Sequence, residues 1–299
     1  MECVMFNYYR WFICFFICAG TVSMDGGVTK DIVSLVSQIS QQHPFSYDLG
    51  IKVIPSKQAH AGITICCHGY GHSNKIINVV HAAQVIPDHL IGFNFPDYNI
   101  TGATDHAKST FGSINEILPL LYIIKRCVHD LELSEINLYG FSAGGGAIIN
   151  ALAVLNQSTY DAQLMDIGIT AALKKQMLEA IERGLIILDC PLKSVEEILA
   201  HRGKSPGLEI LMIRYAQNNM RPIDAIDALH GLRLTILLHF QQPDEILGNH
   251  DDVLFIERLR HANAGNTMVV IGSEGGHNVF HASLWQRYRE FKNLQDTLQ

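Results

Sequence analysis

Short apolar runs alternate with amphipathic stretches along most of the chain. The apolar runs cover residues 51–54, 63–67, 90–95, 136–139, 185–188, 234–238 and 268–271. Between them, apolar residues recur at helical spacing, most clearly over 113–129, where Pro119 predicts a kink or a shifted boundary. Short continuous apolar strands separated by helices are typical of a parallel sheet covered by helices on both faces. The pattern therefore predicts an α/β fold.

No long polar linker interrupts this pattern, so residues 24–299 are predicted to form a single domain. Two helical inserts stand out, near 163–184 and 192–231, and either is placed to cover the carboxyl edge of the sheet as a small cap. The second insert has helical patterns over 208–217 and 222–229 and is rich in apolar residues. These apolar residues either bury the helices against the domain or line a cap that favours an acyl or otherwise apolar substrate.

The first 23 residues form a separate segment. Its apolar run, residues 11–20, is shorter than the roughly 20 residues that a helix needs to span a bilayer, but it has the length of a signal-peptide core. Only Arg10 supplies positive charge before it, and Met24 opens a more polar sequence, so residues 1–23 are either a signal peptide or a mis-called start. An uncleaved anchor or a packed segment is the third interpretation. If residues 1–23 are a signal peptide, the protein is expected to be exported to the periplasm or secreted. Otherwise it is expected to be cytoplasmic. Any contact with a membrane is expected only through residues 11–20.

Charge and composition exclude other classes of protein. The 299 residues include 22 Lys and Arg against 29 Asp and Glu, a formal net charge of −7. Binding to nucleic acid needs a basic stripe, and none is visible, so nucleic acid is not an expected partner. With 48% apolar and 17% charged residues, the composition is that of a folded globular protein.

Four cysteines follow the first segment, at Cys66, Cys67, Cys127 and Cys190. They show neither a CxxC motif nor the spacing of a zinc finger, so we expect buried free thiols. Cys66 and Cys67 are adjacent in one predicted strand, so their side chains should point to opposite faces of the sheet.

The strongest chemical signal is the sequence Gly140-Phe141-Ser142-Ala143-Gly144, which has the pattern G-x-S-x-G. It follows an apolar strand and precedes a helix of small residues. A serine at such a tight turn has a strained backbone and an outward hydroxyl, and the flanking glycines relieve the crowding. The helix amino end presents free amides and positive partial charge to it. The glycines fit neither a phosphate-binding P-loop nor a dinucleotide fingerprint, so the pattern predicts Ser142 as a nucleophile.

A second motif, His-Gly-Tyr-Gly-His at 68–72, directly follows a buried strand. Acyl transfer passes through a tetrahedral oxyanion, which two preorganised amides stabilise. One is expected to be the amide of Ala143, and the other that of Tyr70 in this loop. Glycines between His68 and His72 exclude a regular helix, and no Glu lies between them, so no metal site is predicted. We expect His68 to order the loop and His72 to line the pocket.

A serine nucleophile needs a base at neutral pH, and an imidazole can take its proton and return it to the leaving group. Of the 15 histidines, His277 has the best position for this role. It follows the apolar run 268–271 and a glycine-rich loop, which places it at the carboxyl edge of the sheet.

An acid is expected to orient this imidazole and to stabilise its charged form. The competing carboxylates are Asp189, Asp244, Glu245, Asp251 and Asp252. Asp244 follows an apolar strand and gives the chain order Ser, Asp, His, so it is the predicted acid. Asp189, which follows another strand, remains the alternative. Asp251 and Asp252 are explained as acids favoured at the start of a helix.

Together these motifs resemble those of the α/β-hydrolases, over nearly the whole chain after about residue 46. The resemblance implies Ser142 as nucleophile, His277 as general base and acid, and Asp244 as orienting acid. It implies the Tyr70 and Ala143 amides as the oxyanion site. It also implies a mostly parallel sheet of about eight strands, and a reaction that needs no metal or organic cofactor.

The expected function is a serine hydrolase that cleaves an ester, thioester or amide bond through an acyl-enzyme. A carboxylic ester is the leading substrate class, so the expected partner is a small acyl ester or thioester, or a peptide. One alternative is a catalytically silent binding or scaffold protein with the same fold. Another is an acyltransferase that uses the same residues to pass the acyl group to an alcohol or an amine.

Overall fold

The computed structural model describes most of the chain after its first 25 residues. The described residues are 26–58, 61–70, 72–82, 86–96, 112–202, 220–249, 251–274, 276–277 and 284–291. The predicted signal peptide or mis-called start at 1–23 lies outside them, and so does the helical pattern over 208–217.

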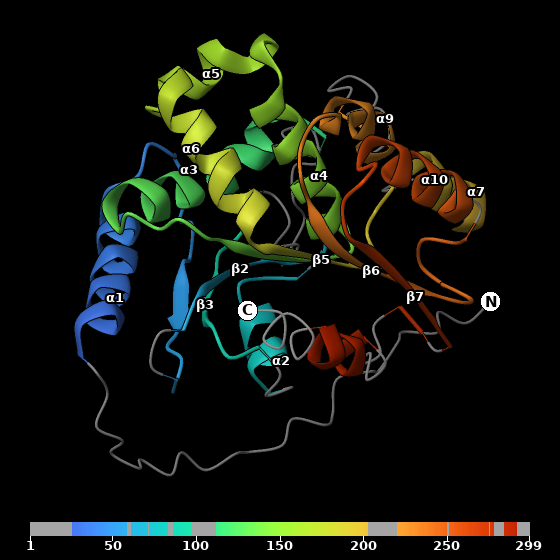
Figure 1. Ribbon diagram of the computed structural model, residues 1–299, viewed down its shortest axis with the longest axis horizontal. Coiled ribbons are helices and arrows are strands. Elements are labelled where there is room, and N and C mark those ends of the chain that lie inside the picture. The colour runs from blue at the N-terminus through green and yellow to red at the C-terminus, as the bar shows by residue number, and fades with distance from the viewer. Residues whose placement is uncertain are drawn as a thin grey trace, which may run out of the picture.

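The core of the molecule is one seven-stranded sheet (Figure 1). Its strands are β1 (Lys52–Ile54), β2 (Ile63–Cys67), β3 (His89–Gly92), β4 (Asn137–Phe141), β5 (Leu185–Asp189), β6 (Thr235–Gln241) and β7 (Met268–Ser273). They lie in the order β1-β3-β2-β4-β5-β6-β7, with β1 antiparallel to β3 and every other neighbour parallel. The predicted mostly parallel α/β sheet is therefore confirmed.

Helices cover both faces of this sheet. They are α1 (Gly26–Gln41), α2 (Ile76–Ala82), α3 (Ile114–Asp130), α4 (Ala143–Asn156), α5 (Asp161–Asp166), α6 (Ala171–Arg183), α7 (Val195–Arg202), α9 (Pro222–Ala225), α10 (Asp252–Ala262), the short η2 (Ser158–Tyr160) and η3 (Ile226–Leu229), and a helix over 284–291. In Figure 1, α3, α4 and α6 lie above the sheet and α1 lies at its left end, while α2 and the red helix lie below it.

The inner strands have no exposed face, which explains their continuous apolar sequences, whereas the edge strands β1 and β7 are partly exposed. Every residue of β2, β3, β4 and β5 is buried. Cys67 packs in the cluster under α3 and α4, whereas Cys66 packs in the cluster under α2, so the two thiols face opposite sides as predicted. All four cysteines in the described residues are buried and free, as predicted.

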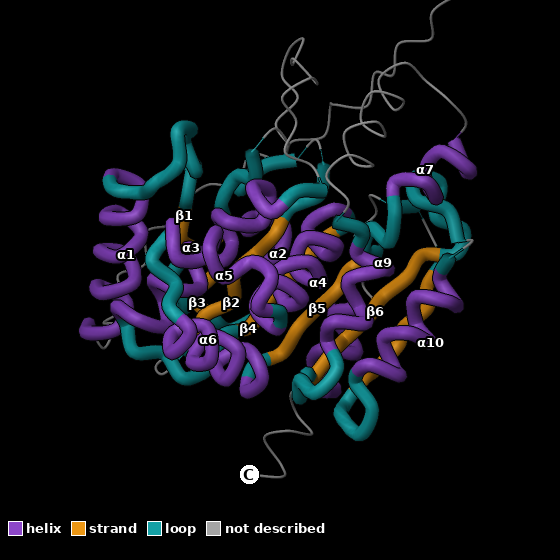
Figure 2. Tube along the Cα trace, turned by 90° about the horizontal axis from the view of Figure 1, so that it is seen from above, coloured by secondary structure: helices purple, strands orange, loops and turns teal. Residues whose placement is uncertain are grey.

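Pro119 lies inside α3, which runs over Ile114–Asp130 where the sequence predicts 113–129. One local expectation is corrected. The insert near 163–184 does not cover the carboxyl edge of the sheet. Its helix α6 contacts α3 and α4, and the amide of Ile136, just before β4, donates to the carbonyl of Ala180, at 3.0 Å, near the amino edge (Figure 2). This segment is therefore the crossover into β5 rather than a cap.

The sheet order places two loops side by side at its carboxyl edge. The chain goes from β2 outward to β3 and then returns to β4 on the other side of β2. Such a reversal opens a crevice at the carboxyl ends of the two adjacent strands. The loop that follows β2 and the turn that follows β4 meet there, with Cys67 paired to Gly140 across the ladder.

A search for membrane-spanning helices over the described part of the chain finds none with the necessary length and apolar character.

Candidate active site

The turn between β4 and α4 has the strained geometry that the sequence predicts. Ser142 has φ 53° and ψ −121°, a positive φ that residues other than glycine seldom adopt. Its N–H donates to the carbonyl of Asp189 at 2.9 Å, and its own carbonyl accepts the N–H of Leu192 at 2.9 Å and that of Gly145 at 2.9 Å. The backbone of the serine is therefore fixed from β5 and from the segment that follows β5.

The glycines of the turn are required by close packing. A Cβ on Gly144 would lie 2.3 Å from the carbonyl oxygen of Cys67, and a Cβ on Gly140 would lie 2.7 Å from the Cα of Gly145. Both contacts involve backbone atoms, which cannot rotate away. The absence of these side chains lets the start of α4 approach the end of β2.

The loop after β2 lies against the serine. A Cβ on Gly69 would be 3.1 Å from the Cβ of Ser142, so the chain passes directly beside it before reaching Tyr70. The ring of His68 is fully buried. Its Nδ1 lies 2.8 Å from the carbonyl oxygen of Gly69, and its Nε2 accepts the N–H of Phe95 at 3.1 Å.

Burial lowers the pKa of His68 to about 4, so the ring is neutral at neutral pH. Because Nε2 accepts a hydrogen bond, Nδ1 carries the proton and donates it to the carbonyl of Gly69. His68 thus ties the loop after β2 to the end of β3, which is the ordering role that the sequence predicts.

The predicted base and acid lie in direct contact. His277 Nδ1 is 2.7 Å from Asp244 Oδ2, and both side chains are buried. The other carboxylate oxygen, Asp244 Oδ1, accepts the N–H groups of Ile246 at 2.9 Å and Leu247 at 2.7 Å.

Several groups act on the ionisation of Asp244. Burial alone would raise its pKa, but the hydrogen bond and charge of His277 and the amides of Leu247 and Ile246 together lower it. The carboxyl group is therefore ionised and can only accept hydrogen bonds. His277 Nδ1 must then be the donor, which leaves Nε2 as the nitrogen that can take a proton.

The other carboxylates have different partners. Both oxygens of Glu245 accept the main-chain N–H of His277 at 2.8 Å, so this residue holds the backbone of the histidine and not its ring. Asp189 Oδ1 lies 2.8 Å from His239 Nδ1, and Asp189 Oδ2 accepts the hydroxyl of Tyr139 at 2.9 Å. The structure therefore joins Asp244, and not Asp189, to the ring of His277.

Two buried Asp–His pairs consequently lie near the carboxyl edge of the sheet, and the second ring nitrogen of each histidine distinguishes them. His239 Nε2 lies 2.7 Å from the hydroxyl of Ser273, so both of its nitrogens are engaged. Within the described part of the chain, the ring of His277 makes its hydrogen bond through Nδ1 alone. Of the four ring nitrogens in the two pairs, His277 Nε2 is therefore the one that can accept a proton from a reacting hydroxyl.

Phe141 connects His277 to the turn of Ser142. The ring of His277 lies 5.1 Å from that of Phe141, and the ring of His72 meets Phe141 edge-on at 5.7 Å. No hydrogen bond joins the Ser142 hydroxyl to His277 among the residues that the structure describes. Such bonds often tighten only when substrate binds. Burial, with the nearby His277, lowers the pKa of His72.

Two groups of described residues have the side-chain types of a metal site, and they share Cys190. Asp189 and His239 form one group with it, and Asp244 and His277 form the other, with the ligand atoms of each group within 4.8 Å of one another. In both groups the carboxylate and imidazole are hydrogen-bonded to each other, at 2.8 and 2.7 Å. The arrangement is therefore that of two hydrogen-bonded acid–base pairs around a thiol.

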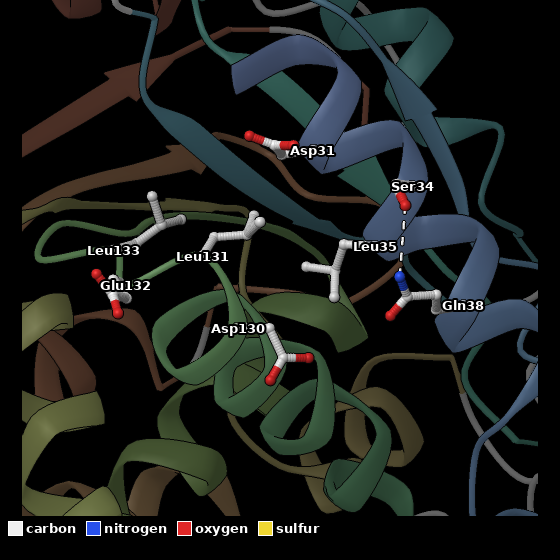
Figure 3. A pocket seen from close by; sticks show the side chains of 8 residues that line it. All are labelled: Asp31, Ser34, Leu35, Gln38, Asp130, Leu131, Glu132 and Leu133. Carbon is white, nitrogen blue, oxygen red and sulfur yellow. Dashed lines mark hydrogen bonds between the residues drawn. The ribbon is translucent and has the colours of Figure 1, made fainter. Parts of the chain in front are cut away.

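A surface cleft lies elsewhere, between α1 and the end of α3 (Figure 3). Its lining residues are Asp31, Ser34, Leu35, Gln38, Asp130, Leu131, Glu132 and Leu133. Since α3 ends where the chain turns towards the start of β4, this cleft lies at the amino edge of the sheet. Ser142 lies at the opposite edge, so the cleft does not belong to the candidate site.

Sequence reasoning missed Lys193 and Asn249, which lie beside the loop of the acid, and the contacts that Asp252 makes with both of them. Lys193 is 1% exposed and Asp252 is 4% exposed. Asp252 does begin α10 as predicted, but it also forms an ion pair with Lys193. The one signal in the sequence is the position of Lys193, which follows the apolar strand ending at Asp189 after only Cys190, Pro191 and Leu192.

Replacement of Gly144 by alanine is expected to destabilise the protein. The new Cβ would meet the backbone oxygen of Cys67, and overpacking of this kind costs about 2–3 kcal/mol. Gly272→Ala is the matched control, because no atom lies within 4 Å of a Cβ built there. Urea unfolding of both variants provides the measurement, and equal midpoints would contradict the close approach.

Protonation of His68 is expected to weaken folding in mild acid. Its pKa is about 4 in the folded protein against 6.5 normally, so its contribution to stability is complete above pH 6.5 and disappears as the pH falls towards 4. The full effect is about 3 kcal/mol. The difference in unfolding free energy between the wild type and His68→Gln should narrow across this range. Parallel pH curves for the two proteins would contradict a neutral buried ring.

The amino-acid sequence matches no known family model and no curated protein. Solved structures do match its fold. Esterase B from Lactobacillus rhamnosis superposes with a TM-score of 0.56 at 10% identity, over 90% of this chain and 96% of that protein. Est1E from Butyrivibrio proteoclasticus, in a structure with ferulic acid bound, gives a TM-score of 0.54 at 14% identity over 84% and 96%.

A peptidase also shares this architecture. The acylaminoacyl peptidase from Pyrococcus horikoshii superposes with a TM-score of 0.54 at 13% identity, over 84% of this chain and 40% of the peptidase. At such low identities the likeness is one of fold. Together with the strand order and the turn after β4, it establishes that this chain has the α/β-hydrolase fold.

Proposed function

We propose that the protein is a serine hydrolase in which Ser142, His277 and Asp244 act as nucleophile, base and orienting acid. The observation that carries the proposal is the 2.7 Å contact between Asp244 and His277, which leaves Nε2 of the ring as proton acceptor. That ring packs on Phe141, the residue next to a serine with positive φ. A buried, oriented imidazole beside a strained serine turn is what activation of a hydroxyl requires.

The reaction begins with attack of the Ser142 hydroxyl on the acyl carbon of the substrate. His277 Nε2 takes the hydroxyl proton as the new C–O bond forms, and the carbonyl oxygen becomes an oxyanion. His277 then returns the proton to the leaving alcohol, thiol or amine as its bond to the acyl carbon breaks. Water, deprotonated by the same imidazole, then attacks the acyl carbon. The bond from this carbon to the serine oxygen breaks as His277 returns the proton to that oxygen, and the carboxylic acid is released.

Asp244 acts on His277 through its charge and its geometry. Ionised at neutral pH, it accepts the Nδ1 proton and stabilises the imidazolium that forms when Nε2 takes the proton of the serine. The amides of Ile246 and Leu247 hold the carboxylate in place. The acid therefore selects the useful tautomer of the ring and does not itself take up the proton.

The oxyanion is proposed to bind the amides of Ala143 and Tyr70. Ala143 is the first residue of α4, whose free amino-terminal amides and dipole face the turn. Tyr70 follows Gly69, which packs against the Cβ of Ser142. A pair of such amides lowers a barrier by several kcal/mol, since one lost donor costs about 3 kcal/mol.

A carboxylic ester is the proposed substrate class, with thioesters and amides as further bonds that the same chemistry cleaves. The two esterases with this fold support that order of preference, and the peptidase keeps amide bonds in view. An acyltransferase would use the same residues with an alcohol or an amine in place of water. Analysis of the products formed with added acceptor alcohols distinguishes the two.

Ser142 is expected to react with a fluorophosphonate probe and to support hydrolysis of p-nitrophenyl esters. Ser142→Ala should abolish both, because no other hydroxyl of the described residues combines a positive φ with this position. Ser158→Ala, an exposed serine in η2, is the control and should retain both. No labelling of the wild type and no hydrolysis across ester chain lengths and peptides would favour the catalytically silent scaffold.

Asp244→Asn is expected to lower kcat by about 10⁴-fold, because an amide donor favours the wrong tautomer of His277. Asp189→Asn is the matched control, since Asp189 is also a buried carboxylate bonded to a histidine. It should change kcat by less than about tenfold. The measurement is the kcat of both variants on one ester. A larger loss of kcat in Asp189→Asn than in Asp244→Asn would identify Asp189 as the orienting acid.

A further inference from the structure

The loop that carries Asp244 is fixed by buried and half-buried polar residues that make no contact with the Ser142 hydroxyl or with the ring of His277. We propose that Asn249, Asp252 and Lys193 are positioning residues that set the place of Asp244 relative to His277. The expected effect on catalysis rests on the proposed function, whereas the expected effect on the contact between Asp244 and His277 does not.

Asn249 holds the loop at three points. Its Oδ1 accepts the main-chain N–H of Asp244 at 2.9 Å. Its Nδ2 donates to the carbonyl of Gln241, the last residue of β6, at 2.7 Å, and to Asp252 Oδ2 at 2.7 Å. One side chain thus joins the end of a strand, the backbone of the acid and the start of α10.

Lys193 holds Asp252 in turn. Its ammonium group forms ion pairs with Asp252 and with Glu197, the latter at 2.8 Å, and lies 3.4 Å from the carbonyl oxygen of Gly248. Its side chain is 1% exposed, as is that of Glu197. A buried ammonium group is tolerated only when it is paired and hydrogen-bonded, so these contacts strongly restrict its position.

The same segment also reaches the nucleophile. Leu192, immediately before Lys193, donates its N–H to the carbonyl of Ser142 at 2.9 Å. The turn of the serine and the loop of the acid are therefore both attached to residues 192–193. A shift of the loop would move Asp244 relative to Ser142 and to His277, and misplacement by about 1 Å is enough to lower a catalytic rate by 10²-fold.

The decisive variant is Asn249→Ala, which removes three hydrogen bonds without leaving a buried charge unpaired. The expected result is a fall in kcat of about 10–100-fold with KM changed less than about twofold, because substrate binding is untouched and base orientation is weakened. Asn263→Ala is the matched control. Asn263 is more buried than Asn249, bonds both backbone groups of Leu234, and lies at the amino edge of β6.

A direct readout of the acid–base contact is the downfield proton resonance of His277 Nδ1–H in solution. It is assigned by its loss in His277→Gln, and the corresponding resonance of His239, assigned with His239→Gln, serves as the internal reference. In Asn249→Ala the His277 signal should move upfield or broaden while the His239 signal stays. Asp252→Asn, an isosteric change, should shift the His277 resonance in the same direction by a smaller amount. This variant replaces Asn249→Ala in the test if Asn249→Ala does not fold.

An unchanged His277 resonance and unchanged kcat in both Asn249→Ala and Asp252→Asn would overturn the inference. So would equal losses in Asn249→Ala and Asn263→Ala, because that result indicates stability alone. The resonance does not depend on turnover, so it tests the network even if no substrate is hydrolysed. Failure of the proposed function appears instead as an unlabelled Ser142 in a protein whose His277 resonance still responds to Asn249→Ala.

Discussion

Ser142 keeps a positive φ because neighbouring parts of the sheet hold its backbone at both its N–H and its carbonyl. A conformation of this kind costs of order 1–3 kcal/mol for a residue with a side chain. The hydrogen bonds that offset this cost are made with the carbonyl of Asp189, at the end of β5, and with the N–H of Leu192 just beyond it. The turn is therefore a property of the sheet as well as of its own five residues, and a change of register between β4 and β5 would release it.

The carboxyl edge of the sheet concentrates buried charge, and hydrogen bonding decides what each pair of side chains can do. Asp189–His239 and Asp244–His277 have the same chemistry and nearly the same separation. The first pair lies at strand ends with both imidazole nitrogens engaged. The second lies on loops, with one nitrogen held by the acid and the ring resting on Phe141. The first pair is enclosed by the packed sheet, whereas the second lies on loops near the strained serine, where the proposed mechanism needs a proton acceptor.

Several features followed from the sequence pattern alone. The apolar runs predicted each of the seven described strands, because strands buried on both faces need continuous apolar sequences. The small residues of 140–144 predicted the tight turn, and the order of Asp244 and His277 predicted which groups would meet at the carboxyl edge. The pattern was less informative for α6, which has an amphipathic sequence whether it covers the sheet or caps the edge. The choice between those places depends on contacts with α3 and α4.

The sequence by itself determined the strands and their mostly parallel arrangement, and it predicted a short set of residues as nucleophile, base and acid. These depend on local pattern and on the rule that parallel strands end at one edge. Only the tertiary structure showed that Asp244, and not Asp189, contacts the ring of His277, because each carboxylate lies at or after the end of a strand and the difference is which imidazole lies 2.7–2.8 Å away. It also decided that Lys193, Asn249 and Asp252 meet. Lys193 is far from the other two in sequence, and Asn249 and Asp252 look like ordinary loop and helix-start residues. Their contacts with one another are what give them a common role.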